Sequence, residues 1–143
     1  MVKWSTPENL LTLQYWESVG GTLIMEFHVV KKTATSQKRI VDAVIIPDGP
    51  TETALAKNVS IEGRDIIVVQ TKTYPLDLIN FGQALGGAEL LKEYFRPASV
   101  RAVAVCVGHD EAMERLAARF GVEVVVLDPI VVLDAATPAI GPP

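Results

Sequence analysis

Residues 65–73 (DIIVVQTKT) constrain the fold of this chain more than any other segment. Their first half is a run of apolar, mostly β-branched residues. It lacks the alternation of apolar and polar residues that is typical of a strand with one solvent-exposed face. A strand of this kind is buried on both sides. We therefore expect a central strand of a sheet that is covered by helices on both of its faces.

The flanking segments predict the element order α-β-β-β-α-β-α-β. Thr6 is a suitable N-cap for a first helix with Pro7 at its first position, and Gly20 and Gly21 end that helix. Three strands in a meander followed by two helical crossovers predict a mixed sheet. The expected helices cover residues 7–19, 78–95 and 110–120, and the expected strands cover residues 22–31, 39–46, 65–73, 100–107 and 122–127, with a short edge strand at 58–61.

Length and composition agree with one α/β domain. The chain has 143 residues, 49% of them apolar, which is enough for a single core. We assign residues 1–136 to this domain and the Pro- and Gly-rich residues 137–143 (TPAIGPP) to a flexible tail. Cys106 is the single cysteine, and neither a signal peptide nor a run of about 18 apolar residues occurs. These features predict a cytoplasmic protein without a membrane span.

Three polar residues interrupt segments that otherwise have core character. Asp42 lies inside RIVDAVII, and Gln70 and Lys72 lie two apart, on one face of the central strand. One explanation is a single site, in which Asp42 and the side-chain oxygen of Gln70 bind Mg²⁺ or Mn²⁺ and Lys72 stabilises charge on a phosphoryl group. The other is a buried salt bridge between Asp42 and Lys72, with Gln70 as a satisfied core amide.

The segments RIVDAVIIPD and VVQTK, followed by a helix with Gln83, resemble the PD-(D/E)xK nuclease superfamily, the restriction endonuclease-like group. Its common core, α-β-β-β-α-β, resembles residues 7–107, and the last helix and strand then form a C-terminal α-β extension. By this resemblance Asp42 and Lys72 are the motif aspartate and lysine. Gln70 stands where most members have Asp or Glu, as in Mrr-type members. The resemblance implies a Mg²⁺-dependent endonuclease that hydrolyses DNA phosphodiester bonds.

A second catalytic carboxylate could come from Glu8, Glu17 or Glu26. Glu8 and Glu17 are nine residues apart, or about 900° of helical rotation, so only one of them can face the site. Glu17 aligns with the apolar side of its helix, which favours an inward position. Glu8 is similar in place to the helix glutamate of resolvase-like members.

DNA contacts are expected from the connection between the first two strands. The chain carries a net charge of −4, yet residues 27–41 contain no acid. The same stretch holds Lys31, Lys32, Lys38 and Arg39, which predicts a basic hairpin that holds phosphates; a merely solvated hairpin tip is the alternative. Gln83 resembles the helix glutamine of RecB-like nucleases. Its helix also contains Gly82, Gly86 and Gly87, which indicate a close approach of the helix backbone to the sheet, to DNA or to a second subunit, with packing on the sheet favoured.

Two functional classes follow. The first is a DNA endonuclease, for which a homodimer is favoured because a domain this small covers little duplex. The second is a nuclease-fold protein without catalysis that serves as a DNA-binding or assembly module. Zinc-ligand spacing and a glycine-rich dinucleotide loop are both missing from the sequence, so we expect no organic cofactor.

Overall fold

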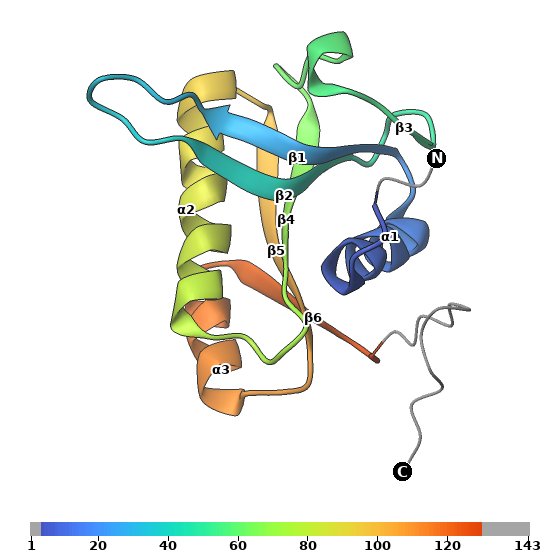
Figure 1. Ribbon diagram of the computed structural model, residues 1–143, viewed down its shortest axis with the longest axis vertical. Coiled ribbons are helices and arrows are strands. Elements are labelled where there is room, and N and C mark those ends of the chain that lie inside the picture. Colours follow the sequence, from blue (N-terminus) through green and yellow to red (C-terminus); the bar gives the residue numbers. More distant parts are fainter. Residues whose placement is uncertain (1–3, 130–143) are drawn as a thin grey trace.

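The structure, a computed structural model, describes residues 4–129 and has three layers. A six-stranded sheet forms the middle layer (Figure 1). Helix α1 (Pro7–Val19) lies on one face of the sheet, and helices α2 (Leu78–Phe95) and α3 (Glu111–Arg119) lie on the other. The α/β class and the helices on both faces are as predicted, whereas the tail predicted at residues 137–143 lies outside the described residues.

The sheet is mixed, with the strand order β3-β1-β2-β4-β5-β6. Strand β1 (Thr22–Val30) pairs antiparallel with β2 (Arg39–Ile46), and β2 pairs antiparallel with β4 (Asp65–Thr71). Strands β5 (Ser99–Val107) and β6 (Val122–Leu127) continue the sheet in parallel, each reached through a helix. The doubly apolar segment of the sequence is therefore the central strand β4, between β2 and β5, as predicted.

Side-chain caps fix where the helices begin. Oγ1 of Thr6 accepts a hydrogen bond from the Asn9 N–H at 3.2 Å, and the Asp77 carboxylate accepts one from the Asn80 N–H at 2.8 Å. Asp110 caps α3 in the same way. Each cap satisfies an N–H that has no partner within its own helix, so these short polar residues fix the starts of the helices.

One predicted element is wrong. Residues 58–61 do not form the edge strand. The edge is instead β3 (Glu52–Thr53), which lies parallel to β1, followed by a single 3₁₀ turn, η1 (Ala56–Asn58). A two-residue strand carries no usable alternation pattern, so the sequence offered no signal for it.

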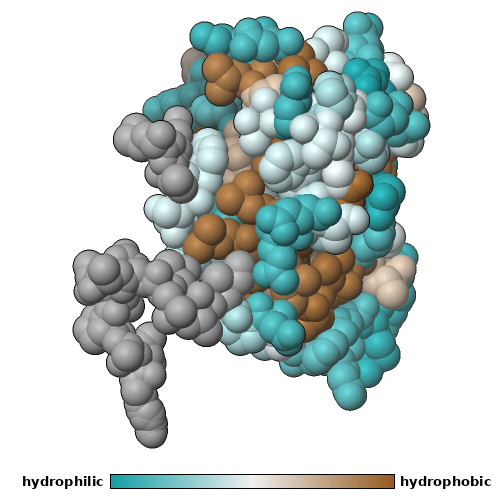
Figure 2. Space-filling view, turned by 90° about the vertical axis from the view of Figure 1, so that its right-hand side faces the viewer, coloured by the Kyte–Doolittle hydropathy of each residue, from teal (hydrophilic) through white to brown (hydrophobic). Residues whose placement is uncertain are grey.

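Two apolar clusters fill the spaces on either side of the sheet. The α2 side holds Val44, Ile66 and Val68 against Ala84 and Leu91, among others. The cluster on the α1 side is the smaller of the two, because a single helix covers that face. Leu11 and Tyr15 pack there on inward residues of β2, β4 and β5. Figure 2, which looks onto that side, shows apolar surface that remains visible between hydrophilic side chains.

Among the described residues, no helix combines the length and the apolar character that crossing a bilayer requires.

Candidate active site

The site lies where strands β2 and β4 part. Their last paired residues are Ala43 and Val69, and beyond them the ladder stops. Side chains then take over the hydrogen bonds that a continued ladder would have made. The Asp42 N–H donates to Oε1 of Gln70 at 2.8 Å, and the Thr71 N–H donates to Oδ2 of Asp42 at 2.7 Å. The opening between the strands is thus held by the residues that the sequence singled out.

Strands β1 and β2 are both irregular at this point. Glu26 lies opposite Asp42, between the pairs Met25–Ala43 and Phe27–Val41, and has a left-handed backbone with φ of 51°. The first of these pairs packs on the α1 side and the second on the α2 side. Residues two apart should share a face, so the alternation shifts on both strands at Glu26 and Asp42. A non-glycine residue in this conformation is strained, as is common at functional sites.

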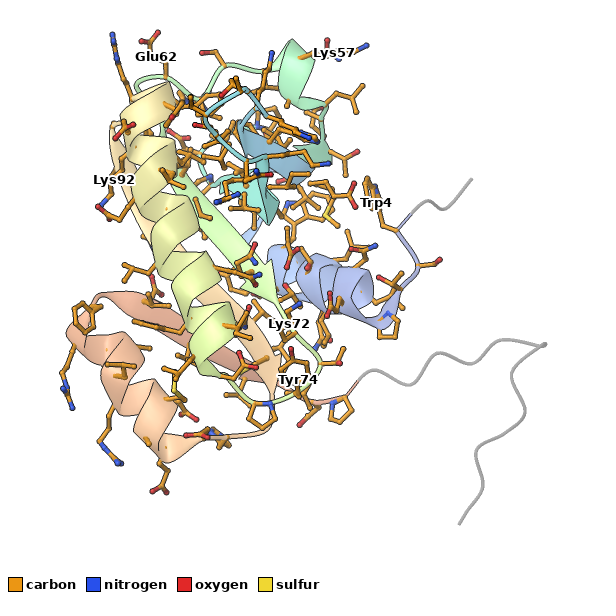
Figure 3. All side chains as sticks on the ribbon, turned by 60° about the vertical axis from the view of Figure 1, so that its left-hand side comes forward. Trp4, Lys57, Glu62, Lys72, Tyr74 and Lys92 are labelled. Atoms are coloured by element: carbon orange, nitrogen blue, oxygen red, sulfur yellow. The ribbon has the colours of Figure 1, made fainter. Side chains whose placement is uncertain are left out.

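Helix α1 adds a carboxylate and an anchor. Oε2 of Glu8 lies 3.7 Å from Nζ of Lys72, which follows the end of β4 (Figure 3). One turn further along the helix, the buried Thr12 hydroxyl lies 2.7 Å from the hydroxyl of Thr71. Because Thr71 is also the donor to Asp42, the two threonines tie α1 directly to the centre of the site.

The inward position expected for Glu17 is wrong. Its side chain is exposed, while Glu8, Thr12 and Tyr15 are on the side of α1 that meets the sheet. Nine residues separate the two glutamates, or about 13 Å along the helix axis, so Glu17 is also far from Asp42 along that axis. The prediction followed Leu10 and Leu13, which are only partly buried, whereas the buried residues of α1 are Leu11, Thr12 and Tyr15.

Electrostatics single out Asp42. Burial raises the pKa of its carboxyl, and the negative charges of Glu8 and Glu26 raise it further; the Thr71 N–H and Lys72 act in the opposite direction. Charges from three other segments, those of Glu8, Glu26 and Lys72, therefore act on the Asp42 carboxyl. Negative charge predominates around this half-buried carboxyl, and a bound cation would offset the resulting repulsion.

The alternative interpretation of these polar residues, a buried salt bridge between Asp42 and Lys72 with Gln70 as a satisfied amide, is only partly confirmed. Lys72 pairs with Glu8, and no ion pair joins it to Asp42 among the described residues. Gln70, in contrast, is a satisfied amide. Its oxygen accepts from Asp42, and its nitrogen donates to Oε1 of Gln83 on α2 at 3.3 Å. One lone pair of the Gln70 oxygen is thus used within the protein, which leaves the second for any other partner.

The four predicted cations of the hairpin are all exposed. Lys31 and Lys32 follow β1, Lys38 precedes β2, and Arg39 opens β2 three residues before Asp42. None of them makes an ion pair with the residues that the structure describes. Figure 1 shows this connection projecting past the upper half of α2.

The glycines of α2 have two different settings. A β-carbon at Gly87 would lie 2.6 Å from Cγ1 of Val41, so Gly87 serves the predicted close packing on the sheet. The same explanation is wrong for Gly82 and Gly86, where a β-carbon would meet nothing within 4 Å. These two positions border an open groove instead.

Two solved structures share this fold. One is a repair endonuclease from Pyrococcus abyssi, with a TM-score of 0.55 and 19% identity over 91% of this chain and 50% of that one. The other is a complex of EndoMS with dsDNA, with a TM-score of 0.55 and 17% identity over 88% of this chain and 46% of the other. The chain spans about half the length of each protein. No protein-family model and no curated protein matches the sequence.

At these identities the likeness shows the fold alone: both structures share the mixed six-stranded sheet with helices on its two faces that was predicted from the order of elements. Sequence reasoning missed Thr12 and Thr71, which join α1 to the site, because hydroxyls on the inner faces of a helix and a strand carry no distinguishing pattern. Glu26 was one of three open choices, and only its strained backbone opposite Asp42 distinguishes it.

Proposed function

We propose that this protein is a metal-dependent endonuclease that hydrolyses phosphodiester bonds of DNA at the opening between β2 and β4. The observation that carries the proposal is that Glu8, Glu26 and Lys72, from three other segments, act on the half-buried carboxyl of Asp42 at that opening, with Glu8 paired to Lys72. The shared fold of the two repair endonucleases, one of them in a complex with dsDNA, supports the choice of DNA as the substrate.

The donors at the site suit a hard divalent cation such as Mg²⁺ or Mn²⁺. Oδ1 of Asp42 accepts no hydrogen bond from the described residues, and Glu8 offers a second carboxylate. Within residues 4–129, no three His, Cys, Asp or Glu side chains are grouped closely enough to enclose a metal by themselves. Mg²⁺ commonly binds through one or two carboxylates and keeps several waters or substrate oxygens, so two carboxylates are sufficient.

Each side chain then has a task. Asp42 and Glu8 would hold the metal, which supplies Lewis-acid stabilisation of the phosphoryl oxygens when bound. Lys72, about a quarter exposed, offers an ammonium group that can orient the attacking water or offset charge that develops on the phosphate. Gln70 braces the backbone of Asp42, and Gln83 braces Gln70.

The experiment is cleavage of linear, branched and single-stranded DNA with Mg²⁺, Mn²⁺ or EDTA. Wild type should cleave only with a metal, and Asp42→Ala and Lys72→Ala should each abolish cleavage while circular dichroism shows an intact fold. Glu17→Gln, which removes a charge from the same helix as Glu8 at an exposed position, serves as the control. Wild type that cleaves none of these substrates would contradict the proposal.

A second function, a DNA-binding or assembly module without catalysis, is favoured by one observation. Both ends of the Gln70 amide are engaged within the protein, and by the resemblance Gln70 stands where most nucleases of the superfamily have a second acid. Titration calorimetry separates the two functions. Mg²⁺ or Mn²⁺ binding that Asp42→Ala removes supports the endonuclease, whereas DNA binding without any metal binding supports the module.

A further inference from the structure

Two grooves flank the base of the β1–β2 connection, both on the α2 side of the molecule. The first, of about 480 Å³, runs between β2 and the first half of α2; Lys38, Arg39, Gln83 and Gly86 line it. The second, of about 590 Å³, lies between the end of β1, the η1 segment and the last turn of α2; its lining includes His28, Lys31, Lys57 and Tyr94. The two grooves share α2 as a wall.

The first groove leads out of the candidate active site. Gln83 belongs to both, since its Oε1 accepts from Gln70, which in turn accepts from Asp42. Gly82 and Gly86 leave the floor open, because nothing lies within 4 Å of the places where their β-carbons would be. At these two positions α2 therefore presents no side chain that would block a polymer bound beside Gln83.

Charge identifies the kind of polymer. Lys38 and Arg39 stand on the wall of the first groove, and Lys31 and Lys57 stand on the wall of the second. Among the described residues none of these four cations has an ion-pair partner, although the chain as a whole carries a net charge of −4. Across the two linings, these four unpaired cations outnumber the one acid, Glu62. Such an excess of positive charge suits a polyanion, and a phosphodiester backbone is the polyanion that the proposed site would cut.

We infer that the two grooves form one track for the DNA strand that leads away from the cut, with Lys57 and Tyr94 at its far end. This inference rests on the proposed function and adds the path of the substrate. Lys57 lies on η1, outside the basic hairpin, and Tyr94 is about half exposed at the end of α2. A tyrosine hydroxyl and a lysine ammonium are both common donors to phosphate oxygens.

The length of the track sets its reach. Gln83 and Tyr94 are eleven positions apart on one helix, which corresponds to about 16 Å along the helix axis. Each strand of duplex DNA carries one phosphate per about 3.4 Å of helix axis, so a duplex lying parallel to the track would place about five phosphates of one strand along it. The site therefore engages DNA mainly on one side of the scissile bond.

The test measures binding of a labelled duplex of about 20 base pairs in EDTA, across a range of salt concentrations, so that cleavage plays no part. Lys31→Gln combined with Lys57→Gln should weaken binding several-fold and lower the slope of log K against log salt by about 0.9 for each lysine. Lys92→Gln is the control, because Lys92 is on α2 but lines neither groove, pairs with Glu89 and points away from Lys57 in Figure 3. It should keep the wild-type slope.

Gly86→Leu tests the path without a change of charge. Leucine is a better helix former than glycine and meets open space there, so the melting temperature should stay the same or rise while DNA binding weakens several-fold. A lysine pair variant with the wild-type slope, a Lys92→Gln variant with an equal loss, or a Gly86→Leu variant with wild-type affinity would overturn the track. Because these measurements need no catalysis, a failed cleavage assay with intact binding would count against the endonuclease and not against the track.

Discussion

The backbone N–H of Asp42 and the side-chain oxygen of Gln70 form a 2.8 Å hydrogen bond at the point where strands β2 and β4 separate. Gln70 thus does in the folded protein what a further ladder bond would do, and it does so beside the carboxylate of the residue that it holds. A neutral amide suits this place because Glu8 and Glu26 already raise the pKa of Asp42. Gln70 therefore holds the opening between the strands without adding a further negative charge beside Asp42.

Gln70→Glu should shift the balance between the metal-free and metal-bound protein. A glutamate can still accept from the Asp42 N–H, but it adds a fourth negative charge to the site. We expect a lower melting temperature without metal and Mg²⁺ affinity that is several-fold tighter. Thermal unfolding with and without Mg²⁺, together with calorimetry, gives both numbers. Metal affinity that is unchanged would show that position 70 does not sense the cation.

Asp42→Asn should abolish metal-dependent cleavage and at the same time stabilise the metal-free fold at pH 7 by about 1 kcal/mol. The asparagine oxygen can keep the hydrogen bond from Thr71 while the unfavourable buried charge disappears.

The same variant should lose a pH dependence that wild type shows. The pKa of Asp42 is higher in the folded than in the unfolded protein, so the folded state binds the proton more tightly, and wild-type stability should fall as pH rises from the ordinary aspartate pKa through the raised one. Denaturant unfolding of both proteins across the acidic pH range measures the difference. Curves that run parallel at all pH values would contradict the raised pKa.

Glu8→Gln should weaken Mg²⁺ binding by about tenfold or more, because it removes the second carboxylate of the site and the partner of Lys72. Calorimetry and single-turnover cleavage measure the effect. Glu17→Gln carries the same change of charge on the same helix, and its exposed position predicts wild-type values. Equal losses in both variants would mean that the charge of the helix matters and the position of Glu8 does not.

Thr12→Val should destabilise the protein by about 1–3 kcal/mol, because it leaves the buried Thr71 hydroxyl without its partner at 2.7 Å. Thr71→Val should behave alike. The double variant should lose clearly less than the sum of the two, since neither buried hydroxyl then remains unpaired. Strict additivity in denaturant unfolding would show that the two hydroxyls are not coupled.

The sequence by itself determined the order of elements and the identity of the central residues. Strand β4 is predicted as a central strand because apolar residues fill both of its faces, and Thr6 marks a helix start because its side chain satisfies a backbone N–H group locally. Asp42, Gln70 and Lys72 stand out for the same local reason: polar groups interrupt segments whose neighbours are apolar. All these signals depend on residues that are close in the sequence.

Only the tertiary structure decided which acid joins Asp42 and how the site is held. The choice of Glu8 over Glu17 depends on the direction in which α1 crosses the sheet, and the helical pattern alone pointed to the wrong one. The place of Glu26 depends on an irregularity shared by two paired strands, and the role of Gln70 depends on where the ladder between β2 and β4 ends. These are relations between residues 16 to 64 positions apart, and their physical cause is packing and pairing geometry that no local pattern in the sequence records.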